Sequence, residues 1–188
     1  MDVEKVLLTG LGRFDGVLQE VKADDWDRPS TCAEWTAREL VGHVLFVTGN
    51  AATLLRGGAP DYGAQVDLAA TAGDDPVAAF RRLEPETREA LRDADLDAVM
   101  ETPMGPMPVR KRLAFPAMDL HLHAWDLGRT FGVDVEVPEE IAQFVHEAID
   151  PMPDEQVRSE GVFGPEVAAP DDATPTERLM AWTGREVR

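Results

Sequence analysis

Three residues have the types and the spacing to hold a metal ion: His43, Asp119 and His123. Asp119 and His123 are four positions apart, which places their side chains one above the other on the same face of a helix. His43 lies in the segment ELVGHVLFV, where its near neighbours are apolar residues or glycine. Buried imidazole and carboxylate groups need partners, because an unpaired polar group in a core costs a few kcal/mol. One divalent cation would satisfy all three side chains together.

The donor atoms of this trio are two imidazole nitrogens and one carboxylate oxygen, as in an open zinc centre with water in the remaining position. The same donors suit Fe(II) or Ni(II), so ligand type alone does not choose the metal, and zinc is the first candidate. A second interpretation stays open for each residue. His43 could be a hydrogen-bonded core histidine, and Asp119 with His123 could be a helix-stabilising pair.

Other polar residues lie close to the trio in the sequence. His121 is two positions from both Asp119 and His123 and therefore points about 160° away from them, so we leave it outside the ligand set. Asp126 could orient a ligand imidazole without touching the metal, or it could be a helix cap or a surface ion pair. Cys32 has acidic neighbours that oppose ionisation, and we expect a packed, inert thiol.

The candidate ligands fall on two of four predicted long helices, in which apolar residues recur at steps of three and four. Thr36 and Glu39 form a capping box at the start of the helix that carries His43. Glycines inside the first helix, such as Gly10, point to close helix packing. The four predicted helices cover residues 3–21, 37–56, 76–93 and 110–130.

Two prolines fall inside these predicted helices. Pro85 should kink or split the third helix, whereas the fourth helix should either bend at Pro116 or begin there after a short turn. Residues 57–76 are predicted to form a long loop, and residues 101–109 a tight turn or short hairpin.

Beyond Gly132, the segment PEEIAQFVHEAI predicts a further helix that Pro138 can open, and TPTERLMAWTG a short final one. With no convincing run of alternating strands, these elements predict an all-α fold, a four-helix bundle with additional short C-terminal helices. We expect residues 1–188 to form a single domain, with the core bundle over about 1–132 and an appendage over about 133–188.

The composition restricts the partners and the compartment. Thirty-six acidic residues against eighteen basic ones give a formal charge of −18, which disfavours nucleic acid and anionic membrane surfaces. No apolar run approaches the roughly 20 residues of a membrane span, and the N-terminus lacks the pattern of a signal peptide. A single cysteine fits a reducing compartment, so we expect a cytoplasmic protein. The sequence does not decide the oligomeric state, and a homodimer remains open.

Three segments of the chain resemble one known family. STCAEWTARELVGHV is similar to the second-helix signature of the DinB-like metal-binding proteins, in the actinobacterial branch related to mycothiol-dependent maleylpyruvate isomerase. TPMGPMPVRKRLAFPAMDLHLHAWDLGRTFG resembles the fourth-helix region of that branch, and RLMAWTGRE its usual C-terminus. The resemblance covers both candidate metal-bearing helices and the tail, with order and spacing in agreement.

The resemblance implies a DinB-like four-helix bundle whose metal ligands fall on His43, Asp119 and His123. Two departures matter. The isomerase branch has Glu where this chain has Asp119, so the shorter arm must approach the metal more closely. The isomerase also carries a sizeable C-terminal domain, whereas only residues 133–188 follow Gly132 here, so substrate contacts from that domain cannot be assumed.

The function implied is a metal-dependent, thiol-using enzyme of the mycothiol S-transferase or mycothiol-dependent isomerase type, in which the metal activates the thiol of mycothiol as a thiolate. Its partners would be this small-molecule thiol and an electrophilic substrate. No residue has a pattern strong enough to name a general acid or base. The alternatives are a metal-dependent hydrolase and a non-catalytic, stress-related metal-binding protein. A closed site with Asp126 or His121 as fourth ligand would favour the non-catalytic reading.

Overall fold

The computed structural model describes residues 1–22, 25–102, 105–158 and 162–187. Within these residues the secondary structure consists of helices and one two-stranded hairpin, joined by loops. This composition confirms the predicted all-α class. The elements, in chain order, are α1 (Val3–Glu20), α2 (Ala37–Leu55), α3 (Leu68–Ala72), α4 (Pro76–Asp93), β1 (Val99–Met100), β2 (Met107–Pro108), α5 (Val109–Arg112), α6 (Ala114–Phe131), α7 (Glu139–Ile149), α8 (Asp154–Val157) and α9 (Pro175–Trp182).

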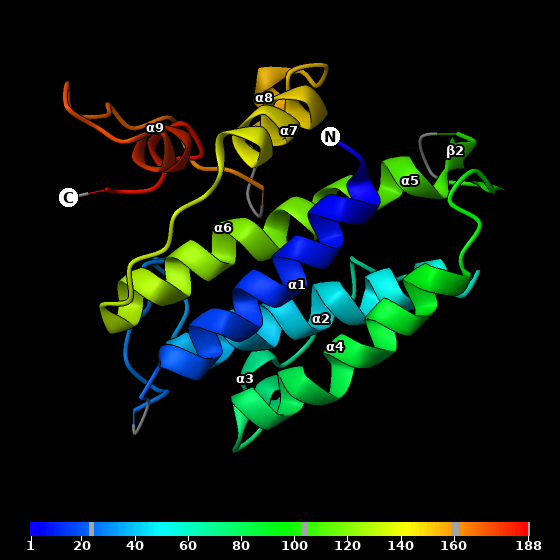
Figure 1. Ribbon diagram of the computed structural model, residues 1–188, viewed down its shortest axis with the longest axis horizontal. Helices are drawn as coiled ribbons and strands as arrows, with labels where there is room; N and C mark the ends of the chain where they lie inside the picture. Colours follow the sequence, from blue (N-terminus) through cyan, green and yellow to red (C-terminus); the bar gives the residue numbers. More distant parts are fainter. Residues whose placement is uncertain (23–24, 103–104, 159–161, 188) are drawn as a thin grey trace.

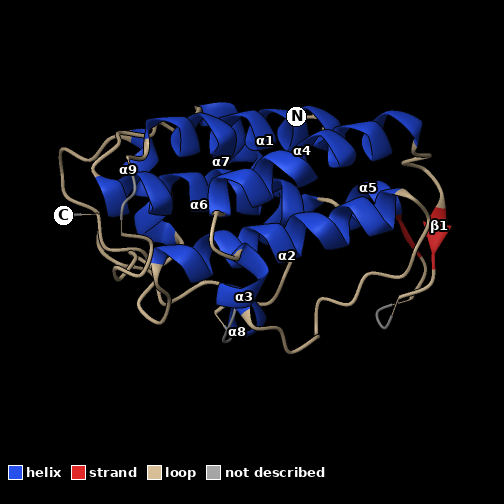
Figure 2. Cartoon of the chain, turned by 90° about the horizontal axis from the view of Figure 1, so that it is seen from below, coloured by secondary structure: helices blue, strands red, loops and turns tan. Residues whose placement is uncertain are grey.

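The four long helices α1, α2, α4 and α6 form the bundle (Figure 1). Helix α1 packs against α6 and α4, and α2 packs against the same two helices. Helices α1 and α2 therefore lie diagonally across the bundle, and α6 is a neighbour of both. The side view in Figure 2 shows the long helices running along the length of the molecule. This arrangement is the predicted DinB-like four-helix bundle.

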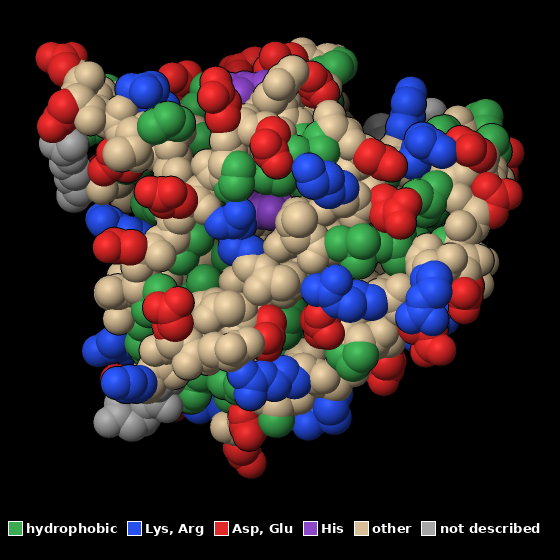
Figure 3. All heavy atoms as spheres, viewed as in Figure 1, with side chains coloured by type: hydrophobic (Ala, Val, Ile, Leu, Met, Phe, Trp, Pro, Cys, Tyr) green, Lys and Arg blue, Asp and Glu red, His purple; other side chains and the backbone are tan. Residues whose placement is uncertain are grey.

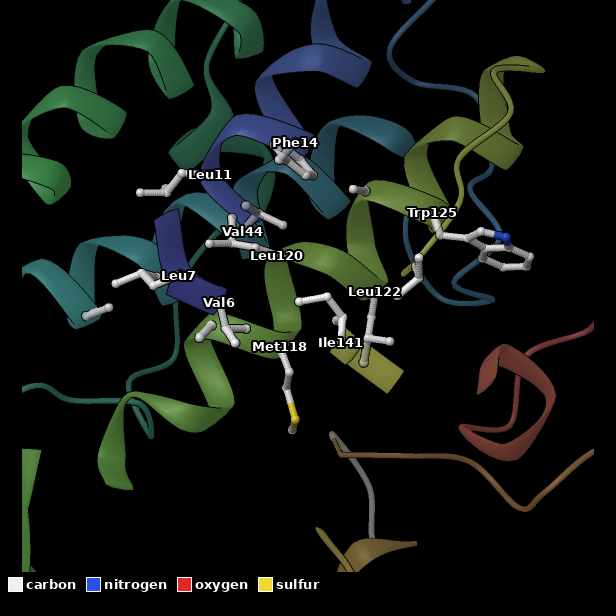
Figure 4. Packing of buried hydrophobic residues seen from close by; sticks show 14 of the residues in the cluster. Val6, Leu7, Leu11, Phe14, Val44, Met118, Leu120, Leu122, Trp125 and Ile141 are labelled. Carbon is white, nitrogen blue, oxygen red and sulfur yellow. The ribbon is translucent and has the colours of Figure 1, made fainter. Parts of the chain in front are cut away.

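The bundle is held together by apolar side chains from all of its long helices, which form one buried cluster (Figure 4). At its centre the rings of Phe14 and Phe80 lie 4.9 Å apart and join α1 to α4. Burial of such side chains is the main term that favours the folded state, at roughly 25 cal/mol per Å² of apolar surface. A polar group buried in this cluster therefore needs a hydrogen-bond or ionic partner to offset its loss of contact with water.

The boundaries of the two helices nearest the candidate site follow from local signals. Thr36 and Glu39 form the predicted capping box at the start of α2, in which Glu39 N donates to Thr36 Oγ1 at 3.2 Å and Thr36 N to Glu39 Oε2 at 2.8 Å. Helix α6 begins at Ala114, after the short α5, so Pro116 falls in its first turn, where no backbone donor is needed. The second of the two alternatives for Pro116 is thus the observed one.

Two predictions about the segment from α2 to α4 need correction: the split at Pro85, one of two alternatives beside a kink, and the loop over residues 57–76. Pro85 does not split its helix, because α4 is continuous from Pro76 to Asp93. Pro85 lies on the exposed face, where water can bond the backbone carbonyl that it leaves free. The loop over 57–76 contains the unpredicted helix α3, which packs against α2 at Gly42, where a Cβ would lie 1.9 Å from Leu68 O.

The predicted turn over 101–109 is part of a short hairpin, in which β1 pairs with β2 in antiparallel register. Residues 103–104 of that prediction lie outside the described residues, as do residue 24 of the loop before α2 and residues 159–161 of the C-terminal loop.

The C-terminal segment, defined here as residues 133–188, returns along the outside of the bundle. Helix α7 packs on α6, and α9 packs on α7 (Figure 1). Pro138 precedes α7 and Pro175 opens α9, and only the short α8 was not predicted. Arg158, just after α8, donates hydrogen bonds to the carbonyls of Gly164 and Trp182 and so anchors the end of α9.

The surface carries charges of both signs. Figure 3 shows acidic and basic side chains interspersed over the visible face. None of the described helices is long and apolar enough to cross a membrane.

Candidate metal centre

The three predicted ligands meet between α2 and α6. His43 extends from the middle of α2, and Asp119 and His123 extend from α6 one turn apart. One nitrogen from each histidine and one oxygen of Asp119 all lie within 4.8 Å of one another. The trio is only partly enclosed, because the side chains of His43 and Asp119 are 21% and 25% exposed while His123 is 8% exposed. The centre is thus not sealed from solvent.

Each histidine of the trio lies close to a different oxygen of Asp119. Asp119 lies between the histidines, with Oδ2 3.3 Å from His43 Nε2 and Oδ1 3.3 Å from His123 Nε2. In a tetrahedral zinc centre with bonds of roughly 2.0–2.2 Å, neighbouring donor atoms lie about 3.3–3.6 Å apart. The same distances also let the carboxylate accept a hydrogen bond from each imidazole, so the donor set fits both a metal and a proton-linked cluster.

The electrostatics of the trio favour bound positive charge. Burial by itself would raise the pKa of Asp119, but His123 and His43 outweigh it and hold this pKa well below its usual range. Burial would lower the pKa of His123, yet Asp119 and Asp126 raise it well above its ordinary value. The position between the three side chains therefore holds either a proton or a cation.

Asp126 lies where an orienting carboxylate is expected. Its Oδ2 accepts a hydrogen bond from His123 Nδ1 at 2.8 Å, and the residue is fully buried. This contact places the hydrogen of His123 on Nδ1 and directs the lone pair of Nε2 toward Asp119 and His43. Carboxylates that hold a ligand histidine in this way fix its tautomer and increase its basicity. The surface reading of Asp126 does not hold, because no part of it reaches solvent.

Arg185, from the C-terminal segment, is a neighbour of the site that the sequence did not predict. Its Nε lies 2.9 Å from Asp126 Oδ1, and its Nη2 lies 2.8 Å from Asp126 Oδ2. Burial would raise the pKa of Asp126, but Arg185 and His123 hold it well below its usual range. Arg185 belongs to the RLMAWTGRE segment, whose resemblance to the family's C-terminus marked it as a candidate for a role. Nothing in the sequence indicated which residue the arginine contacts.

A second group of donors shares His123 and competes with the first. Cys32 Sγ lies 4.0 Å from His123 Nδ1, and Cys32, His123 and Asp126 together could hold a metal on the other side of the ring. The guanidinium of Arg185 already binds both oxygens of Asp126, so a cation there would face a buried positive charge. We therefore favour the group formed by His43, Asp119 and His123.

Cys32 is half-buried beside the site. It lies in the loop before α2, between Pro29 and Thr36, which pair in an isolated antiparallel β-bridge. The sequence predicted a packed thiol and did not place it next to His123. In the same loop, Trp35 lies over His43 with ring centroids 4.6 Å apart and covers this ligand on one side.

His121 lies on the far face of α6, as its spacing predicted. It is fully buried against α1, where Nε2 donates to Val6 O at 3.0 Å and Nδ1 accepts from Arg13 Nε at 3.1 Å. His121 is therefore a structural link between two helices and cannot serve as a fourth ligand. His146, on α7, lies beside Trp182 and Asp150 and is not part of the trio.

The chain folds as a bundle of four long helices, and two histidines and a carboxylate converge between two of them. This arrangement defines a DinB-like bundle. The chain belongs to the family described as "Mycothiol maleylpyruvate isomerase N-terminal domain", whose family model matches residues 7–128. The matched residues include the whole trio. The resemblance inferred from the sequence is therefore confirmed.

The chain is also similar to two curated proteins in sequence and to two solved structures in fold. The uncharacterized proteins MT0763 and Rv0738, from two strains of Mycobacterium tuberculosis (CDC 1551 / Oshkosh and ATCC 25618 / H37Rv), are each 28% identical to the chain over 180 residues, 93% of both lengths. The crystal structure of mycothiol-dependent maleylpyruvate isomerase is similar over 76% of this chain, with a TM-score of 0.63 and 17% identity. A histidine-to-alanine mutant of that enzyme gives a TM-score of 0.59 and 15% identity.

The similarity to the isomerase is a similarity of fold, and it does not extend over the whole enzyme. The aligned part covers 65% of the isomerase chain. The M. tuberculosis relatives, by contrast, match this chain over almost their full length.

Proposed function

We propose that this protein is a metal-dependent enzyme that uses a low-molecular-weight thiol, of the mycothiol S-transferase or mycothiol-dependent isomerase type. The observation that carries the proposal is the convergence of His43, Asp119 and His123 between α2 and α6, within a family named for a mycothiol-dependent enzyme. Zinc is the first candidate for the metal, with Ni(II) and Fe(II) as alternatives.

Each residue around the centre has a defined task in this proposal. Nε2 of His43, Nε2 of His123 and the carboxylate of Asp119 would hold the metal, and Asp126 keeps the hydrogen of His123 on Nδ1. A bound divalent metal would supply the positive charge that favours the thiolate form of a thiol at neutral pH. Trp35 packs over His43 and limits the approach of water on that side.

A metal held by these three side chains alone would keep an open coordination position, which supports an enzyme over a structural metal site. Neither residue that could close the site is free to do so: Asp126 is bound to Arg185 and to the other nitrogen of His123, and His121 is bound to Val6 and Arg13 on the opposite face. Three protein ligands with a fourth position left for water or substrate are typical of catalytic zinc sites.

The test begins with metal content, measured by elemental analysis on protein purified without a metal-chelating tag. We expect about one equivalent of zinc, nickel or iron in the wild type and its loss in His43→Ala and His123→Ala. His146→Ala is the matched control, because this histidine lies outside the trio and should leave the metal content unchanged. Equal, negligible metal in all four proteins would contradict the proposal.

Activity is then measured on the metal-loaded protein. We expect mycothiol-dependent turnover of maleylpyruvate or of a panel of electrophiles such as aryl halides and epoxides, and its loss in the two histidine variants. Hydrolysis of esters or amides without any need for thiol would instead identify a metal hydrolase, in which the same position activates water. Stoichiometric metal with neither activity would favour a non-catalytic metal-binding protein.

A further inference from the structure

The buried contact between Arg185 and Asp126 joins two parts of the chain that are 59 positions apart. The guanidinium donates through both Nε and Nη2 to the carboxylate, and Nη1 donates to Thr183 Oγ1 at 3.0 Å. Asp126 has no exposed surface and the side chain of Arg185 is 15% exposed. Paired arginine and carboxylate groups of this kind have a fixed geometry, because two parallel hydrogen bonds orient both planes.

Asp126 has one further strong partner among side chains, which is His123. Its Oδ2 receives both the Nη2 hydrogen of Arg185 and the Nδ1 hydrogen of His123, each at 2.8 Å. Thr31 adds a weaker contact to Oδ1 at 3.3 Å. Arg185, in the C-terminal segment, thus holds the carboxylate of Asp126, and this carboxylate in turn holds the ring of His123.

We propose that Arg185 is a positioning residue for the metal centre: through Asp126 it fixes the ring of His123 with Nε2 toward His43 and Asp119. The inference rests on the proposed metal site and adds that the C-terminal segment controls its affinity. The hydrogen bonds of the Arg185 side chain go to Asp126 and Thr183 and not to the trio. Arg185 acts by holding the carboxylate of Asp126 in place against His123.

The pairing also selects one of the two donor groups around His123. Without Arg185, Asp126 would be a buried carboxylate free to join Cys32 and His123 Nδ1 around a cation. With Arg185 in place, the oxygens of Asp126 are occupied and a second positive charge is opposed. The arginine thereby directs metal to Nε2 of His123 and away from Nδ1.

The test measures zinc affinity of the full chain by competition with a chromogenic chelator. Residues that orient a ligand histidine typically change metal affinity by about 10–100-fold, so we expect a weakening of this size in Arg185→Gln. Arg185→Lys keeps the charge and loses the paired geometry, so its affinity should be intermediate. The spectrum of the cobalt-loaded protein should change in Arg185→Gln, because the coordination of the metal is altered.

The matched control is Arg158→Gln. Arg158 anchors the same C-terminal segment through hydrogen bonds to Gly164 and Trp182 but makes none to Asp126. If the segment only stabilised the fold, Arg158→Gln and Arg185→Gln would weaken zinc binding equally. We expect Arg158→Gln to bind within about threefold of the wild type, well below the 10–100-fold range.

A double-mutant cycle shows whether the effect passes through Asp126. In an Asp126→Asn background, Arg185→Gln should cause little further loss, because the carboxylate through which it acts is gone. Independent, additive losses would overturn the inference, as would wild-type affinity in Arg185→Gln. A wild type that binds no zinc would remove the proposed metal centre itself, a failure that is visible without any Arg185 variant.

Discussion

Nδ1 of His121 lies 3.1 Å from Nε of Arg13, and this contact fixes the protonation of a fully buried imidazole. An arginine donates only, so Nδ1 must accept, and the single hydrogen of the neutral ring sits on Nε2 and binds Val6 O. Burial, together with the nearby charge of Arg13, lowers the pKa of His121 to about 4. The neutral ring is therefore part of the packing between α1 and α6.

The low pKa of His121 makes stability depend on pH. Its value in the folded chain, about 4, is below the ordinary 6.5, so the unfolded chain binds the proton more readily. The free energy of unfolding should fall as the pH decreases from about 6.5 to about 4, by roughly 2–3 kcal/mol from this residue. Urea unfolding of metal-free protein across this range measures the effect.

His121→Gln is the comparison for this measurement, because glutamine keeps one donor and one acceptor but does not titrate. We expect the variant to be less stable at pH 7 and to lose less stability on acidification than the wild type. Parallel pH profiles for the two proteins would show that His121 is not the group responsible.

Gly10 is required by the close approach of α1 and α6. A Cβ at this position would lie 2.9 Å from Leu120 Cβ and 3.1 Å from His121 Nε2. Gly10→Ala should therefore destabilise the protein by about 1–3 kcal/mol through overpacking, although alanine is the better helix former. Thermal or urea unfolding measures the change.

Gly16 offers the matched control, since it lies in the same helix and a Cβ there meets nothing within 4 Å. Gly16→Ala should stabilise the protein by up to about 1 kcal/mol. Opposite signs for the two substitutions would confirm the packing role of Gly10, and equal stabilisation would argue against it.

Asp119 should tolerate a longer carboxylate better than the loss of its charge. The isomerase branch that the sequence resembles has Glu at this position, so Asp119→Glu should retain metal, with an affinity within about tenfold of the wild type. Asp119→Asn removes the anionic donor and should weaken binding by about 100-fold or more, at or beyond the upper end of the range for residues that merely orient a ligand. Isothermal titration of metal-free protein with zinc compares the two, and equal affinities would exclude Asp119 as a ligand.

Cys32 distinguishes the two donor groups around His123. If the metal binds at Nε2 of His123, Cys32→Ser should leave zinc content at the wild-type level while His43→Ala abolishes it. The converse result, loss in Cys32→Ser and retention in His43→Ala, would place the metal on the Nδ1 side with Asp126. Elemental analysis of the two purified variants is sufficient.

The sequence predicted those parts of the fold and site that local patterns encode. The capping box of Thr36 and Glu39 involves neighbours in the chain, and the spacing of Asp119 and His123 places them on one helical face whatever surrounds them. Both could be deduced without knowing the packing. The need of buried polar side chains for partners suggested grouping His43 with these two residues, and the resemblance to the DinB-like bundles implied the same trio.

The remaining features depend on contacts between distant residues. Arg185 meets Asp126 across 59 positions, and no pattern in a single sequence indicates which buried carboxylate an arginine will bind. Helix α3 has only five residues, too few for a periodic signal, and owes its place to the close approach of Leu68 to Gly42. The sequence could not exclude a split of α4 at Pro85, because the exposure that makes this proline tolerable is a tertiary property.

The packing of α1 against α6 sets the order in which the bundle can assemble. Val6 and His121 are hydrogen-bonded across 115 positions, whereas the contact of Arg56 with Glu86 between α2 and α4 spans 30. Each doubling of a closed loop costs about 0.6 kcal/mol of chain entropy, so the helical hairpin of α2 and α4 is the easier pair to form first. His43 belongs to that early hairpin, and Asp119 and His123 arrive only when α6 docks. The trio is therefore complete only once α6 has docked against α2.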